Sequence, residues 1–157
     1  MAAGGPASEL IMFIVAVIVA GSVAGALTYV TNDIAHGINE HGKLMADKLR
    51  TDFVIINDPQ NIPVNKSTNP YTYTFYVKNI GKETIAFTSD AIQVFIDGNL
   101  IPVSQLSFED VNGNSITSLQ PYEVGVIKVQ CNLSQGYHTI TIVLENGVKR
   151  KLVFNVS

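Results

Sequence analysis

The residues that bind metals or catalyse reactions in proteins are few and widely spaced in this sequence. His36 and His41 fall on different faces of a predicted helix, and His138 lies about 100 residues later, so the three side chains do not converge on one ion. Cys131 has no recognisable partner His to activate its thiol. No nucleophile elbow surrounds Ser104, Ser107, Ser118 or Ser134. We therefore expect a protein that is not an enzyme and that binds no metal, cofactor or small-molecule substrate.

One short cluster of acidic and amide side chains has a weak likeness to a calcium-binding loop. It comprises Asp110, Asn112, Gly113 and Asn114. An EF-hand loop needs glycine at its sixth position and a bidentate glutamate at its twelfth, where this sequence has Ser115 and Pro121. The cluster therefore predicts a tight turn.

Asparagine offers another chemistry, because Asn-x-Ser/Thr is the acceptor pattern for N-glycosylation. The pattern occurs at Asn65, Asn132 and Asn155. Glycans at these positions would place this part of the chain outside the cytoplasm. Roughly one or two such matches are expected by chance in a chain of this composition. Both interpretations, chance matches and glycosylated sites, therefore stay open.

The longest apolar stretch runs from Leu10 to Val30 and contains no charged residue and no histidine. A helix of that length covers roughly the 30 Å hydrocarbon core of a bilayer. A cleaved signal peptide would have a basic start and a shorter apolar core. We predict a short N-terminal tail at 1–9 and a permanent transmembrane helix at 10–30. Lys43, Lys48 and Arg50 follow the span, and taken alone they favour the rest of the chain inside.

Small residues recur at helical spacing inside the predicted span. They comprise Ala16, Ala20, Gly21, Ala24 and Gly25. Small side chains four residues apart let two helices approach closely in lipid. We call these residues the packing face and expect it to serve self-association or contact with a partner helix, although glycine and alanine are also common in spans that do not associate.

A second helical pattern covers residues 31–52. Ile34, Ile38, Met45 and Leu49 recur at spacings of four or seven, with charged residues on the other faces. The pattern predicts an amphipathic stalk whose apolar stripe packs on partner helices, lies on the membrane surface or folds back on its own domain. The balance of charges in this segment makes attachment to anionic lipid the least favoured of these.

From Phe53 to Ser157 short β-branched and aromatic runs alternate with turn residues. Tyr71 to Val77 shows the period of two that buries one face of a strand. Asp97-Gly98 and Asn146-Gly147 stand between apolar runs and predict hairpin turns. About seven to nine strands at this spacing predict a mainly β fold, an immunoglobulin-like antiparallel β-sandwich at 53–157. Seven basic residues against eight acidic ones give this region a net charge of −1, which argues against nucleic-acid binding.

The span opens with Ala7-Ser8-Glu9-Leu10-Ile11 and leads through Gly21 and Gly25 to a stalk and a β domain. In this order of parts and in this opening the chain resembles the archaeal flagellar protein families FlaG and FlaF, and FlaG more closely. The resemblance implies a stator role in the archaellum, the rotating motility filament of archaea. It implies a sandwich between membrane and S-layer, association with itself and with a FlaF-like partner, and no catalytic residues.

Two other functions stay open. An archaeal type IV pilin or archaellin also carries an apolar helix before a β domain, and cleavage after Gly4 would leave Glu9 at the fifth mature position. Against this, no basic residue precedes that site and Pro6 would become the second residue. A membrane-anchored solute-binding protein would need a concave pocket with convergent polar groups.

Overall fold

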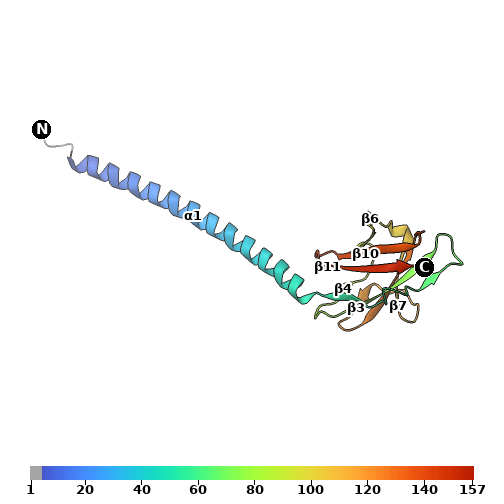
Figure 1. Cartoon of the computed structure of the whole chain (residues 1–157). Coiled ribbons are helices and arrows are strands. Elements are labelled where there is room, and N and C mark those ends of the chain that lie inside the picture. The colour runs from blue at the N-terminus through green and yellow to red at the C-terminus, as the bar shows by residue number, and fades with distance from the viewer. Residues whose placement is uncertain (1–4) are drawn as a thin grey trace. The chain divides into compact units, whose positions relative to one another are not determined.

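The computed structural model describes residues 5–157 as one long helix and a β-rich domain (Figure 1). The helix α1 (Gly5–Arg50) has 46 residues. It begins before the predicted span, continues without interruption into the predicted stalk and ends at Arg50, two residues before the predicted end of the stalk. The chain divides into two compact units, of which the second runs from Leu44 to Ser157. The last turns of α1 therefore belong to the same unit as the β domain.

The polar side chains within the apolar part of α1 bond to the helix itself. The hydroxyls of Ser22, Thr28 and Thr31 donate to the carbonyl oxygens of Ile18, Ala24 and Leu27, at 2.8, 2.9 and 2.8 Å. Such bonds satisfy a hydroxyl without water, as lipid requires. No residue of α1 is buried, and the helix is long and apolar enough to cross a membrane.

The first sheet of the β domain is built on a long central strand. Its strands follow the order β1 (Phe53–Ile55), β3 (Thr72–Asn79), β9 (Val124–Gln130) and β7 (Leu106–Asp110), and β2 (Val64–Asn65) also pairs with β3. All neighbours are antiparallel. Along β3 buried and partly exposed residues alternate strictly, as the sequence pattern predicts.

The second sheet has the order β11 (Lys149–Val156), β10 (Gly136–Leu144), β5 (Ile92–Ile96) and β6 (Asn99–Leu100). A small third sheet pairs β4 (Ile85–Ala86) with β8 (Ser118–Leu119), and the 3₁₀ helix η1 (Val103–Gln105) precedes β7. Asp97 and Gly98, with φ angles of 52° and 83°, form the two-residue turn between β5 and β6. These positive angles are those that the predicted hairpin turn requires.

Apolar side chains from the two large sheets form one core. Phe75 of β3 meets Phe154 of β11 edge to face with ring centroids 5.4 Å apart, and Phe87 meets Phe108 in the same way at 5.2 Å. Both phenylalanines of the first pair are fully buried. The predicted antiparallel β-sandwich on a single N-terminal helix is thereby confirmed.

Two of the strands, β2 and β8, have only two residues each. A strand this short shows no period in the sequence, so local pattern does not predict it. Lys78 and Asn79 end β3, and Asn79 is fully buried although it is polar.

Candidate functional site

The candidate metal ligands of the sequence lie apart. His36 and His41 are on α1 and His138 is on β10. Among residues 5–157 no three His, Cys, Asp or Glu side chains are placed to hold a metal ion. Burial, with a smaller effect of the Asp97 charge, raises the pKa of the Cys131 thiol to about 11, so its reactive thiolate is scarce near neutral pH.

His138 has a structural partner in the turn between β5 and β6. Its Nδ1 lies 2.6 Å from Asp97 Oδ2, and its Nε2 lies 2.9 Å from the carbonyl oxygen of Ser134. The hydrogen bond to Asp97 raises the pKa of His138, and the same bond lowers the pKa of Asp97. The pair fastens the β5–β6 turn to the start of β10.

The Asp110 cluster is the tight turn that the sequence predicts. Asp110 Oδ1 accepts hydrogen bonds from the backbone amides of Asn112 and Asn114, both at 2.8 Å. The hydrogen bond from the Asn114 side chain, together with these backbone bonds and the Asn112 side chain, lowers the pKa of Asp110. The carboxylate therefore closes its own loop.

A set of polar contacts joins the end of α1 to the sandwich. We call residues 47–53, 79–83 and 150 the junction. Lys82 donates its backbone amide to the carbonyl oxygen of Arg50 at 2.8 Å. The amides of Ile80 and Gly81 donate to the carbonyl oxygen of Asp52 at 3.0 and 2.9 Å. The last carbonyls of a helix have no partner within it, and here the 80–82 loop supplies one for Arg50.

Charged side chains add a second layer to the junction. Arg50 Nε lies 2.8 Å from Glu83 Oε1. On the other side Asp52 Oδ1 accepts hydrogen bonds from Arg150 Nη2 and from the backbone amide of Phe53. Arg150 Nε also donates to the carbonyl oxygen of Phe53 at 3.2 Å. The segment after α1 is therefore held by the 80–83 loop and by β11.

Asn79 secures the 80–83 loop from inside the domain. Its Nδ2 donates to the carbonyl oxygens of Glu83 at 2.8 Å and Leu119 at 3.0 Å, and its Oδ1 accepts from the Gly81 amide at 3.0 Å. The residue is fully buried, so each of these bonds replaces one that water would make. These bonds hold the 80–83 loop to β3 and β8, in addition to its contacts with the end of α1.

Gly81 allows the close approach between the loop and the chain after α1. A Cβ at this position would lie 2.5 Å from the Asp52 amide nitrogen and 2.6 Å from the Arg50 carbonyl oxygen. Both are backbone atoms that cannot move aside as a flexible side chain does. Only glycine fits here without a shift of the backbone.

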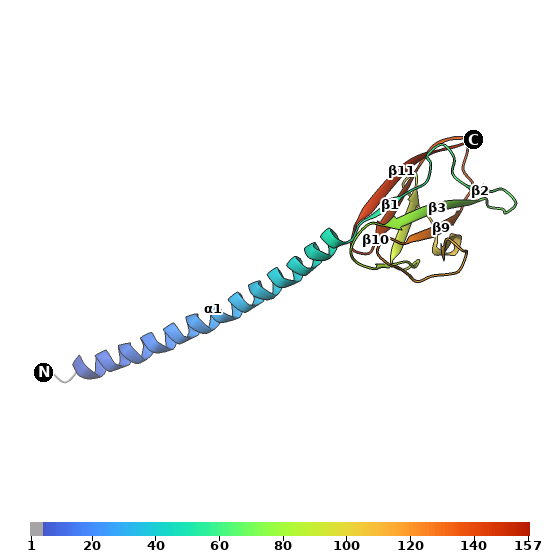
Figure 2. The same cartoon turned by 90° about the horizontal axis from the view of Figure 1, so that it is seen from below.

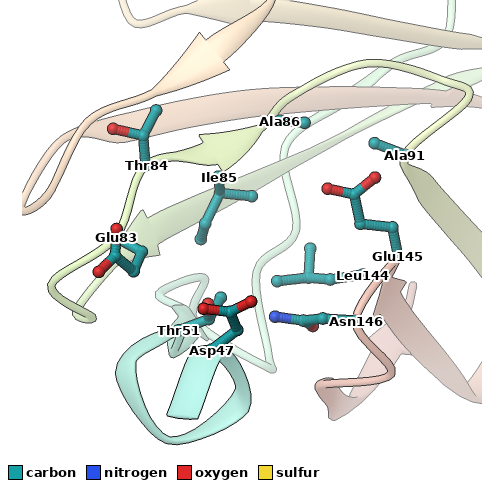
Figure 3. A pocket seen from close by; sticks show the side chains of 10 residues that line it. All are labelled: Asp47, Thr51, Glu83, Thr84, Ile85, Ala86, Ala91, Leu144, Glu145 and Asn146. Atoms are coloured by element: carbon teal, nitrogen blue, oxygen red, sulfur yellow. The ribbon is translucent and has the colours of Figure 1, made fainter. Parts of the chain in front are cut away.

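A hollow of about 250 Å³ lies beside the junction (Figure 3). Residues from the end of α1, from the β4 region and from the β10–β11 turn line it: Asp47, Thr51, Glu83, Thr84, Ile85, Ala86, Ala91, Leu144, Glu145 and Asn146. Three of these carry carboxylates, and Glu83 is already paired with Arg50. The hollow lies between segments that the junction holds together. Its lining contains no nucleophile paired with a base.

The helix residues predicted to make contacts are all exposed. Gly21 and Gly25 have open space where a Cβ would stand. Ile34, Ile38, Met45 and Leu49 are 56%, 66%, 60% and 76% exposed. Because they lie within about 60° of one another around the helix axis, they form one stripe. The chain itself leaves both surfaces available to partners.

The chain matches known proteins over almost its whole length. A family model described as archaeal-type flagellin matches residues 2–154. The chain belongs to this family. The match extends from the apolar helix through nearly the whole sandwich, so the junction lies inside it.

Two relatives resemble the chain over about nine tenths of its length. Both carry the printed name "Putative flagella-related protein G". The protein of Methanocaldococcus jannaschii is 41% identical over 143 residues, which cover 91% of this chain and 90% of the relative. The protein of Methanococcus voltae is 34% identical over 143 residues and 91% of both chains. The resemblance to FlaG found in the sequence is thereby confirmed.

The sequence pattern does not indicate the junction. Local periodicity cannot reveal it, because partners such as Asp52 and Arg150 are 98 positions apart. One signal was present: an uninterrupted helix followed at once by a strand leaves no flexible linker between them.

Proposed function

We propose that the chain is a membrane-anchored structural component of the archaellum motor and acts as a stator that links the motor to the cell envelope. Family membership and the names of the two relatives support a role in the archaeal flagellum. The apolar part of α1 supports an anchor in the membrane. A stator needs such an anchor and a folded domain that does not turn freely on it.

The junction is the observation that carries this proposal. Three backbone hydrogen bonds and two ion pairs hold residues 50–52 against the sandwich. A single bond of this kind contributes about 0.5–1.5 kcal/mol, and an exposed ion pair less than about 1 kcal/mol. Because they act in parallel, a load on the end of α1 must break several at once before the sandwich rotates about the helix. The junction therefore transmits torque.

The remaining parts of the proposal concern partners and location. The packing face and the stripe at Ile34, Ile38, Met45 and Leu49 provide surfaces for self-association. The sandwich stands in the extracytoplasmic space under the S-layer, which it reaches through a FlaF-like partner. None of these roles needs a cofactor, a nucleic acid or a small-molecule substrate.

A second candidate is a filament subunit of the archaellin or type IV pilin kind. The family model that matches the chain describes flagellins, which favours it. The cleavage site it requires follows Gly4, and residues 1–4 lie outside the described part of the chain. Glu9, which would be the fifth mature residue, lies within α1.

Intact mass of the protein extracted from its native membrane separates the two candidates. The stator proposal predicts an N-terminus at Met1 or Ala2 and a chain that stays with the membrane when filaments are sheared off. Loss of the first four residues, together with recovery of the chain in sheared filaments, would establish the filament subunit instead.

A further inference from the structure

The three N-glycosylation patterns, far apart in the sequence, meet at one end of the sandwich. Asn65 pairs with Thr72 at the start of β3. Next to it, the backbone amide of Tyr71 donates to Asn132 Oδ1 at 3.2 Å. Lys66, Leu133 and Asn155, one residue from each pattern, line the same hollow of about 260 Å³.

This end of the sandwich lies away from the junction. β3 begins at Thr72 beside Asn65 and ends at Asn79, which pairs with Phe53 next to the end of α1. In Figure 2 the label of β2 and the C-terminus of the chain lie toward this end, and α1 joins the domain at the other. A group attached here would not disturb the contacts that hold residues 50–52.

The patterns differ in how free their asparagines are to react. Asn65 is exposed, its Oδ1 accepts from the Ser67 amide at 2.9 Å, and its Nδ2 makes no hydrogen bond within the described residues. Asn132 is also exposed and uses only its Oδ1. Ser67 and Ser134, the hydroxyl residues of these two patterns, are exposed as well.

Asn155 stands in a different position. It is partly buried within β11, lies opposite Tyr137 of β10, and donates its backbone amide to the Pro59 carbonyl oxygen at 2.8 Å. A transferase must enclose the acceptor tripeptide, and here that would require separating the end of β11 from β10 and from the segment at Pro59. The fold therefore protects this asparagine.

We propose that Asn65 and Asn132 are acceptors of N-linked glycans and that Asn155 is not. The donor is an oligosaccharide linked through phosphate to a polyprenol. Asn Nδ2 forms a bond to the sugar C1 as the C1–O bond to the phosphate breaks. The phosphate leaves with that electron pair, and the amide proton passes to a base. The inference rests on the proposed function, because it requires the sandwich outside the cytoplasm.

The test is the intact mass of the full chain from its native membrane, with variants of the three serines. Ser67→Ala and Ser134→Ala destroy a pattern and leave the asparagine and its hydrogen bonds in place. Each should remove one glycan mass, and the two together should remove all of it. Ser67→Thr and Ser134→Thr keep the pattern and should keep the mass. Ser157→Ala should change only the mass of the residue itself.

A parent mass equal to that of the bare chain would overturn the proposal, and so would loss of glycan mass in Ser157→Ala. Location is measured separately, with Val111→Cys in a Cys131→Ser background and a membrane-impermeant maleimide on intact cells. Val111 is 62% exposed, so it is available to the reagent. Labelling without glycan mass would reject the acceptor sites and leave the stator proposal standing. Absence of labelling would reject the outside location and the acceptor sites with it.

Discussion

Arg150 on β11 and Asp52 after the end of α1, 98 positions apart in the sequence, form an ion pair in which Arg150 also bonds the backbone oxygen of Phe53. Both side chains are partly exposed, at 46% and 36%. The pair therefore adds little as a charge interaction alone, and its effect comes from tying the first strand to the last beside the helix.

Arg150→Ala should lower the free energy of unfolding by about 1–2 kcal/mol, from the lost bond to Phe53 and the weakened ion pair. Chemical unfolding of the full chain in detergent measures this. Lys151→Ala, at an exposed neighbour on the same strand, should change it by less than about 0.5 kcal/mol. Equal effects of the two substitutions would argue against the specific contacts of Arg150.

Asn79→Ala should be among the most destabilising changes in the domain, with a loss of about 2–4 kcal/mol. It removes the partner of the carbonyl oxygens of Glu83 and Leu119 and leaves the Gly81 amide with its bond to the Asp52 carbonyl oxygen alone. Thermal unfolding of the full chain provides the measurement. Asn99→Ala, at an exposed position of β6, serves as the control and should leave the midpoint nearly unchanged.

Gly81→Ala should force the 80–83 loop away from the chain after α1, because the added carbon meets two backbone atoms at 2.5 and 2.6 Å. Overpacking of this kind costs about 1–3 kcal/mol. Gly42→Ala, in the open part of the helix, should instead be neutral or stabilise by up to about 1 kcal/mol. Unchanged stability of Gly81→Ala would show that the close approach is absent in solution.

The His138–Asp97 pair should make stability depend on pH. The pKa of His138 is raised in the folded state, so its contribution is complete below about 6.5 and is lost as pH rises through the folded value. The pKa of Asp97 is lowered, so its contribution is complete above about 3.9 and is lost as pH falls through the folded value.

The contribution of the pair is therefore greatest between about pH 4 and 6.5. Unfolding midpoints measured across pH should show this maximum in the parent chain and a weaker one in Asp97→Asn. Asp90→Asn, at an exposed position away from His138, should preserve the parent profile. The same profile in both variants would mean that other groups set the pH dependence.

Gly21→Leu with Gly25→Leu should weaken lateral association of the helix without preventing insertion, because bulky side chains keep two helices apart. Crosslinking in native membranes reports the change. Val15→Leu places the same side chain on the side of the helix opposite the packing face as a control. Equally strong crosslinking in the parent, the double glycine variant and the control would contradict a role of the packing face in association.

The features that local pattern encodes were predictable. The strict alternation in β3, the Asp97-Gly98 turn and the uncharged stretch at 10–30 each follow from neighbouring residues. The junction does not, because it depends on pairs such as Arg50 with Glu83 and Asp52 with Arg150 that meet only after the sandwich closes. The burial of Asn79 is not predictable for the same reason. A polar residue in a turn segment is expected to be exposed, and its three bonding partners come together only in the folded domain.

The most direct test of the account is the distance between the end of α1 and the sandwich in the full chain within a bilayer. Spin labels at Leu44→Cys and Val153→Cys, in a Cys131→Ser background, occupy exposed positions on the two sides of the junction. We expect one narrow distance distribution in the parent and a broad one after Arg150→Ala combined with Glu83→Ala. A broad distribution in the parent would mean that the helix end turns freely, and the stator mechanism proposed here would be wrong.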